Sequence, residues 1–206
     1  MSLAASLAVL AGLWLAYGLI HSLLASHACK DAVAARWPGL MPGYRLAFNV
    51  LSVLLLLPIA VWMWSFPGPV LWAFHGIAAW IARGLALAAV VAFWHSTRYY
   101  DMDEFLGLRQ LAERGVRANN GRDTEPFVIS PYHRWVRHPW YFFGLVMLWS
   151  QDMNAASLVS TVAVTLYFIV GSRLEEKKLI AIHGDAYRDY MGKVPGLLPL
   201  PWKRLK

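Results

Sequence analysis

The residues best suited to chemistry form two groups in the second half of the chain. Arg137-His138-Pro139 has Tyr132 before it and Tyr141 after it, and a carboxylate pair, Glu175-Glu176, follows later. Proline favours the first turn of a helix, so the first group places polar side chains beside the free N–H groups of a helix start. Carboxylates, an imidazole and aromatic rings together suit a polar, partly cationic ligand. By themselves these residues indicate a binding pocket and no particular reaction.

Each group also has an ordinary structural interpretation. Arg134 and Arg137 are typical of cationic side chains that anchor a membrane protein at its cytoplasmic face. Trp140 and Tyr141 are typical of the aromatic belt at a membrane interface. Glu175-Glu176 is equally compatible with the start of a surface helix, because two lysines follow directly.

The composition indicates the setting in which these groups must work. Of the 206 residues, 58% are hydrophobic and only 15% are charged, and the mean hydropathy is +0.44. Soluble domains contain about 45–50% apolar and about 25% charged residues. A soluble enzyme, a disordered chain and a secreted disulfide scaffold are therefore disfavoured.

Five stretches without Asp, Glu, Lys or Arg predict an all-α, polytopic membrane protein with about five transmembrane helices. A run of about 20 apolar residues crosses the hydrocarbon core as a helix. Pro67-Gly68-Pro69 divides the longest stretch, and the turn at 151–154 makes a helical hairpin of the last two. The expected spans cover residues 3–26, 46–66, 78–98, a short segment that begins at Pro139, and 155–172.

The distribution of cations predicts the orientation. With five spans, 18 of the 19 Lys and Arg residues fall on one face, and only Arg83 lies opposite. Cytoplasmic loops are rich in Lys and Arg, so this face is expected to be cytoplasmic, as in a bacterial inner-membrane protein, with the N-terminus outside. The net charge of +7 then reports membrane orientation and contact with membrane lipid, and it does not indicate a nucleic-acid partner. Both polar groups share this face.

The regions between and after the spans complete the predicted layout. Residues 115–130 have the composition of a loop. Apolar residues spaced among charges over 173–191 predict an amphipathic helix at the cytoplasmic membrane surface, which ends near Gly192. We expect a three-helix N-terminal region over 1–112 and a functional core over 113–206.

Two sets of residues form recognisable motifs. The first lies in the block 130–199 and consists of Tyr132, Arg137-His138-Pro139, Tyr141, Gly144, Glu175-Glu176, Leu179, Gly184, Tyr187, Tyr190, Val194 and Pro195. With these residues the block resembles the integral-membrane methyltransferase superfamily that contains the isoprenylcysteine carboxyl methyltransferases and their bacterial relatives. The second set consists of the segments 21–26, 44–49 and 105–110. With these segments the N-terminal part resembles the bacterial branch with the methanethiol S-methyltransferases and the NnrU-like membrane proteins.

The resemblance implies an enzyme that binds S-adenosylmethionine from the cytoplasm, between the Arg-His-Pro helix start and the double-Glu helix. It implies methyl transfer to a small or lipophilic acceptor. Such a displacement requires alignment and desolvation, and no metal. The residues expected to contact the cofactor are Tyr132, His138, Pro139, Tyr141, Glu175 and Glu176, and Arg173 is a candidate for polarising the acceptor.

Three departures from the family pattern bear on the acceptor. His133 stands where the family usually has an aromatic residue, and Tyr132 lies one position earlier. Phe143 stands where the family usually has a Gly, and Gly144 follows it. Gly171 stands where the carboxyl methyltransferases have an Arg credited with holding the substrate carboxylate. A thiol acceptor therefore fits best, since a thiol with a pKa of about 8.5 needs only modest activation.

Other functions stay open at the level of sequence. The resemblance also covers carboxyl O-methyltransferases and lipid methyltransferases. In an NnrU-like haem-binding isomerase, His21 and His95 would be haem ligands, although ionisable residues in spans also pack helices together. A non-enzymatic membrane scaffold would bind no S-adenosylmethionine at all. The sequence gives no indication of the oligomeric state.

Overall fold

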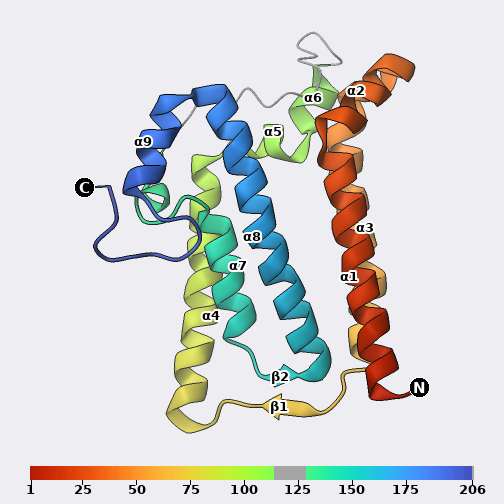
Figure 1. The fold of residues 1–206 in the computed structure, drawn as a ribbon, viewed down its shortest axis with the longest axis vertical. Coiled ribbons are helices and arrows are strands. Elements are labelled where there is room, and N and C mark those ends of the chain that lie inside the picture. The colour runs from red at the N-terminus through yellow and green to blue at the C-terminus, as the bar shows by residue number, and fades with distance from the viewer. Residues whose placement is uncertain (114–128, 206) are drawn as a thin grey trace. The chain divides into compact units, whose positions relative to one another are not determined.

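The computed structural model describes residues 1–113 and 129–205, and the described chain is helical (Figure 1). Most of the loop expected at 115–130 lies outside these residues. Four helices are long and apolar enough to cross a membrane: α1 (Leu3–Ala25), α3 (Met41–Ser65), α4 (Gly76–Ser96) and α8 (Ala155–His183). The helix that begins at Pro139, α7 (Pro139–Trp149), has 11 residues. At 1.5 Å per residue it is about 16 Å long, roughly half of the hydrocarbon core.

The described chain divides into two compact units, and the first contains residues 1–67 and 100–113. Its apolar pair is α1 and α3, where the Trp62 indole donates to the Ser6 carbonyl at 3.1 Å. Shorter helices flank the pair: α2 (His27–Arg36), η1 (Pro38–Leu40), α5 (Met102–Leu106) and α6 (Leu108–Ala112).

Two segments singled out in the sequence, 44–49 and 105–110, meet in this first unit. The side chains of Arg45 and Asn49 both donate to the Phe105 carbonyl, at 3.2 and 3.1 Å. Gly107 ends α5 with φ +89°, and a Cβ there would lie 2.6 Å from the Leu46 backbone nitrogen. Only glycine fits this close approach.

The second unit contains residues 68–99 and 129–205. It consists of β1 (Val70–Trp72), α4, η2 (Thr97–Tyr99), η3 (Tyr132–Arg134), α7, β2 (Met153–Asn154), α8 and α9 (Asp185–Lys193). In Figure 1, α7 lies beside both α4 and α8. The Trp140 indole donates to the Ser96 hydroxyl at 2.7 Å, which joins α7 to the cytoplasmic end expected for α4.

A small antiparallel sheet closes the opposite end of the second unit. The pairing of β1 with β2 is reinforced by the Asp152 carboxylate, which accepts from the Phe74 N–H at 2.8 Å. Asn154 caps α8 by accepting from the Ser157 N–H at 2.8 Å. This sheet was not expected. Pro67-Gly68-Pro69 prevents a helix and leaves the following residues extended, and the hairpin turn supplies their partner.

The predicted tail helix over 173–191 is wrong in its bounds. Instead, α8 continues without interruption from the apolar stretch through Glu175-Glu176 to His183. The chain breaks at Gly184, with φ +60° and ψ −131°, and α9 then runs to Lys193. The onset of charge therefore marks a change of environment and not a helix end, because nothing before Gly184 interrupts the backbone hydrogen bonds.

Candidate functional site

The start of α7 is held by the chain that follows α9. Residues 194–196, here called the C-terminal strap, lie against the Arg-His-Pro motif. The N–H of Arg137 donates to the Pro195 carbonyl at 2.9 Å, and the N–H of His138 donates to the Gly196 carbonyl at 3.2 Å. Pro139 is the first residue of α7 and lacks an N–H, so no donor is lost at that position.

Glu176 lies in the interior of this arrangement. It is only 8% exposed, and its Oε1 accepts from Arg137 Nε at 2.7 Å and from His138 Nε2 at 3.0 Å. A buried carboxylate is stable when it has both a counter-charge and hydrogen-bond donors. Because one oxygen, Oε1, accepts from both side chains, Glu176 joins Arg137 to His138.

Glu175 is the carboxylate that remains accessible. Its side chain is 49% exposed, accepts from the Tyr141 hydroxyl at 3.2 Å and lies 3.4 Å from His138 Nδ1. His138 is itself 5% exposed. Burial lowers the pKa of His138, but the two carboxylates outweigh burial and raise it above the ordinary 6.5. The site therefore combines an imidazole held towards its charged form with one carboxylate open to a ligand.

Three rings stack along the α7–α8 interface beside Glu175. The His138 and Tyr141 rings are 5.3 Å apart at 11°, and the Tyr141 and Phe168 rings are 4.6 Å apart at 6°. Gly144 permits this packing, because a Cβ there would lie 3.1 Å from the Phe168 ring. A Cβ on Gly171 lies 3.8 Å from the Tyr141 hydroxyl, so the position of the missing family Arg adjoins this stack.

Tyr132 faces a different helix. Its hydroxyl lies 3.0 Å from Nδ1 of His95 on α4, and its ring packs edge-on against Phe143. The neighbouring His133 is held by Ser130 at 2.8 Å. Burial, and then the nearby His138, lower the pKa of His133 to about 4, so this imidazole is neutral at physiological pH.

The structure thus brings His138, Tyr141 and Glu175-Glu176 together, with buried Pro139 at the helix start. Tyr132 is not joined to this group by a hydrogen bond or ring contact within the described residues; its side chain contacts His95, Tyr99 and Phe143 instead. Arg173 is exposed, and within the described chain its side chain makes no hydrogen bond or ion pair. Two residues apart on a helix means about 200° of rotation, so Arg173 and Glu175 leave α8 on opposite sides.

The two histidines of the haem alternative contact aromatic rings. His21 stacks with Tyr17 at 5.5 Å and meets Phe48 at 4.9 Å, both within the first unit. His95 contacts Tyr132 as described above. Across residues 1–113 and 129–205, no three His, Cys, Asp or Glu side chains form a group that could hold a metal ion.

Comparison with known proteins decides the family. The chain is 30% identical to the methanethiol S-methyltransferase of Crocosphaera subtropica over 98% of its own length and 78% of that protein. It is 33% identical to methanethiol S-methyltransferase 2 of Bradyrhizobium diazoefficiens, over 89% of the chain and 69% of the relative. The chain belongs to the methanethiol S-methyltransferase family. A shorter match, 40% identical over 48% of the chain, is to the methanethiol S-methyltransferase of Mycobacterium tuberculosis. No family model and no solved structure matches the chain.

Membership in this integral-membrane methyltransferase family confirms the predicted enzyme class. It also implies that S-adenosylmethionine is the methyl donor.

Three residues of the site were missed or misjudged at the level of sequence. The sequence pattern around Arg137 is typical of a simple cationic anchor, whereas in the structure its side chain is only 12% exposed and pairs with Glu176. Phe168 lies two helical turns before Glu175, so its place on the same face of α8 follows from helical periodicity. Gly196 had no recognisable signal, because its contact with the motif comes from the path of the tail.

Proposed function

We propose that this protein transfers the methyl group of S-adenosylmethionine to a small thiol, of which methanethiol is the simplest. The thiol sulfur forms its bond to the methyl carbon as the bond from that carbon to the sulfonium sulfur breaks, so the products are a thioether, S-adenosylhomocysteine and the proton of the thiol. The observation that carries the proposal is the half-exposed Glu175 beside the ring stack, in a chain of the methanethiol S-methyltransferase family. In the relatives methanethiol is the acceptor that their names give, and we extend it to this chain.

The chemistry of the site fits the cofactor. S-adenosylmethionine supplies a methyl group on a positively charged sulfur, together with an amino group and ribose hydroxyls. The Glu175 carboxylate suits the amino or hydroxyl groups, and aromatic faces attract a sulfonium. We assign the open edge of the His138–Tyr141–Phe168 stack to the cofactor, with Pro139 at its base and Glu176 supporting it.

The acceptor assignment is supported by what surrounds Tyr141. Gly171 places no cation there, whereas a carboxylate substrate would need one to offset its charge. A neutral thiol brings no such requirement and enters as a small, largely apolar molecule. The thiol is preferred over a carboxyl acceptor for this reason, and over a lipid acceptor because the relatives' names give methanethiol.

We further propose that the polypeptide crosses the membrane five times with the site on the cytoplasmic side. From the start of α8 at Ala155 to Glu175 the helix rises about 30 Å, the thickness of the hydrocarbon core. The β1–β2 sheet and the Glu175 site therefore lie at opposite membrane surfaces. The short α7 completes its crossing with residues 150–154, of which Met153 and Asn154 pair with β1.

The proposal is tested with purified protein in detergent, methyl-labelled S-adenosylmethionine and methanethiol. We expect label in a volatile thioether, a loss of at least about tenfold for Glu175→Gln and for His138→Ala, and unchanged turnover for the exposed control Asp189→Asn. Prenylcysteine and amino-lipid acceptors are run in parallel. Label appearing only in a methyl ester or a lipid would refute the thiol assignment, and no binding of S-adenosylmethionine would refute the function.

A further inference from the structure

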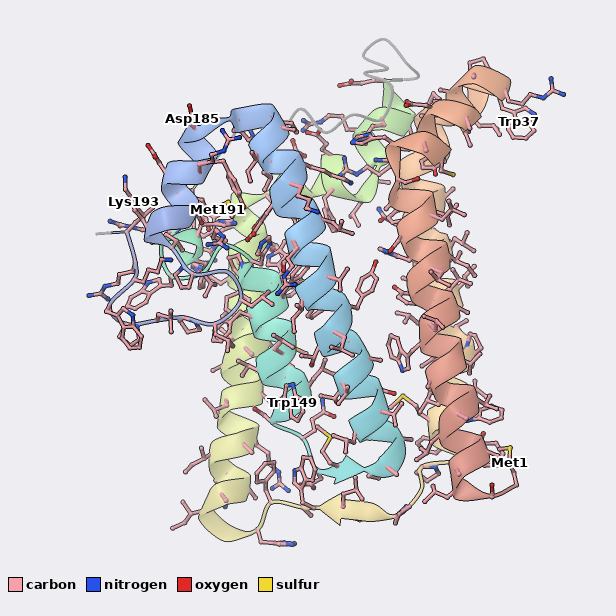
Figure 2. The ribbon with its side chains drawn as sticks, viewed as in Figure 1. Met1, Trp37, Trp149, Asp185, Met191 and Lys193 are labelled. Atoms are coloured by element: carbon pink, nitrogen blue, oxygen red, sulfur yellow. The ribbon has the colours of Figure 1, made fainter. Side chains whose placement is uncertain are left out.

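Arg137 makes contacts that a simple membrane anchor does not need. Its Nε donates to Glu176 Oε1 on α8, while Nη1 donates to the carbonyls of Met191 at 3.2 Å and of Val194. One guanidinium therefore joins the motif before α7, the C-terminal third of α8 and the end of α9. Figure 2 labels Met191 and Lys193 on this last turn of α9, beside the start of α7.

The C-terminal strap packs directly on this guanidinium. A Cβ on Gly196 would lie 3.3 Å from Arg137 Nη2 and 3.9 Å from Glu176 Oε1. Val194 is fully buried, and it forms a core with Tyr187 and Tyr190 of α9. The ion pair is thus enclosed by the strap, by α9 and by the motif, and water has little access to it.

A chain of contacts connects Arg137, through Glu176 and His138, to Glu175 and Tyr141. Arg137 fixes Oε1 of Glu176, and the same oxygen accepts from Nε2 of His138. With Nε2 engaged, the imidazole presents Nδ1 to Glu175 and its face to Tyr141. Arg137 therefore orients, through Glu176, the imidazole that contacts both Glu175 and Tyr141, the two residues that we assign to the cofactor.

We infer that Arg137 is a positioning residue for methyl transfer, which acts through Glu176 on His138 and makes the C-terminal strap part of the site. The inference rests on the proposed function for its effect on the cofactor. It assigns no contact between Arg137 and either substrate. It also gives the strap a role that its distance in sequence, 57 residues from Arg137 to Val194, does not suggest.

The geometry requires arginine in particular. A guanidinium is planar and donates in several directions at once, whereas a lysine ammonium is a point charge at the end of a flexible chain. A lysine at this position could neutralise Glu176, but it could not also hold the carbonyls at the end of α9. Arg137→Lys therefore separates charge from geometry.

The test uses Arg137→Lys, with Arg134→Lys as the matched control. Arg134 stands in the same loop and is exposed, and within the described residues only its backbone carbonyl, which accepts from Leu205, ties it to the tail. We expect Arg137→Lys to weaken S-adenosylmethionine binding about tenfold, the low end for losing the support behind a ligand-holding group. KM for methanethiol should change less than about threefold, and Arg134→Lys should match the wild type.

A double-mutant cycle distinguishes positioning from general structural support. If Arg137 acts through Glu176, Arg137→Lys has little further effect on the cofactor Kd once Glu176→Gln is present. If Arg137 only stabilises the fold, the losses of cofactor affinity in the two single variants add in the double variant. Should Glu176→Gln not fold, Gly196→Val replaces it in the same cycle, because its side chain displaces the guanidinium without removing a charge.

Limited trypsin digestion measures how readily the C-terminal strap opens, and it requires neither cofactor nor acceptor. Lys193 is exposed and precedes buried Val194, so cleavage after it requires the strap to open. We expect faster cleavage there in Arg137→Lys than in Arg134→Lys. Wild-type cofactor affinity and cleavage rate in Arg137→Lys would overturn the positioning role and leave the proposed function intact. A wild-type protein that binds no S-adenosylmethionine would overturn both.

Discussion

The neighbouring carboxylates Glu175 and Glu176 should respond in opposite ways to the same isosteric change. In Glu175→Gln the lost charge is half exposed, at 49%, and exposed pairs contribute about 0–1 kcal/mol to stability. With a dependence of about 2–4 °C per kcal/mol for a chain of this size, the unfolding midpoint should move by less than about 4 °C. Loss of one charged contact to the cofactor should cost about 1–2 kcal/mol, which is about 5- to 30-fold in Kd.

Glu176→Gln removes a buried charge and leaves its partner behind. Arg137 would keep a side chain only 12% exposed without its counter-ion, and removing one member of a buried pair costs about 3–5 kcal/mol. Arg137 retains the carbonyls at the end of α9, and His138 can lose its proton. We therefore expect the lower end, about 3 kcal/mol, or a fall of about 6–12 °C in the unfolding midpoint.

Two measurements on the same detergent samples separate the two changes. Tryptophan fluorescence follows unfolding, and titration calorimetry gives the Kd for S-adenosylmethionine. Asp189→Asn, on an exposed position of α9, controls for loss of one negative charge. The reasoning would be refuted by a Glu175→Gln protein that binds the cofactor like the wild type, or by a Glu176→Gln protein that unfolds like it.

Three further predictions concern stability. The carboxylates raise the pKa of His138 above 6.5, so the stabilisation by its charge is fully present below about pH 6.5 and is lost as pH rises through the pKa of the folded state. The difference in unfolding midpoint between the wild type and His138→Gln should therefore shrink with rising pH. Gly144→Val forces a methyl group into the Phe168 ring and should cost about 1–3 kcal/mol in thermal unfolding. Gly107→Ala, at φ +89° and against the Leu46 backbone, should cost at least about 2 kcal/mol in the same assay.

Each of these has a control within the chain. Gly192→Ala adds a methyl group in α9 where no atom lies within 4 Å, and it should be neutral or stabilising by up to about 1 kcal/mol. If Gly144→Val or Gly107→Ala unfolded at the midpoint of Gly192→Ala, the described packing would be incorrect. A constant difference between wild type and His138→Gln from pH 5 to pH 9 would contradict the assigned titration.

The long helices were predictable because uncharged stretches of this length have few alternatives. Their ends were not. Arg45 stands just before an uncharged stretch and yet lies inside α3, which begins at Met41, and α8 likewise continues beyond Arg173. A charged side chain reports where a helix leaves the apolar core, whereas the helix itself stops only where the backbone is interrupted, as at Gly184.

The meeting of His138 with Glu175-Glu176 was predictable from the hairpin, since the helices before and after a tight turn return to the same level. The stack with Phe168 follows from the period of α8 once that helix is known to be continuous. The contacts of Arg137 with the end of α9 and with the strap were not predictable. They join residues 54 and 57 positions apart, and their acceptors are backbone carbonyls that leave no trace in side-chain pattern.

The packing of α4 against α7 has a consequence for biosynthesis. Ser96 and His95 leave the ribosome well before their partners, since Trp140 follows Ser96 by 44 residues and Tyr132 follows His95 by 37. At about 5–20 residues per second, α4 waits about 2–9 seconds in the bilayer before these two partners have been synthesised. The half of the protein that carries the site is therefore completed last, when translation delivers a hairpin to a helix already in the membrane.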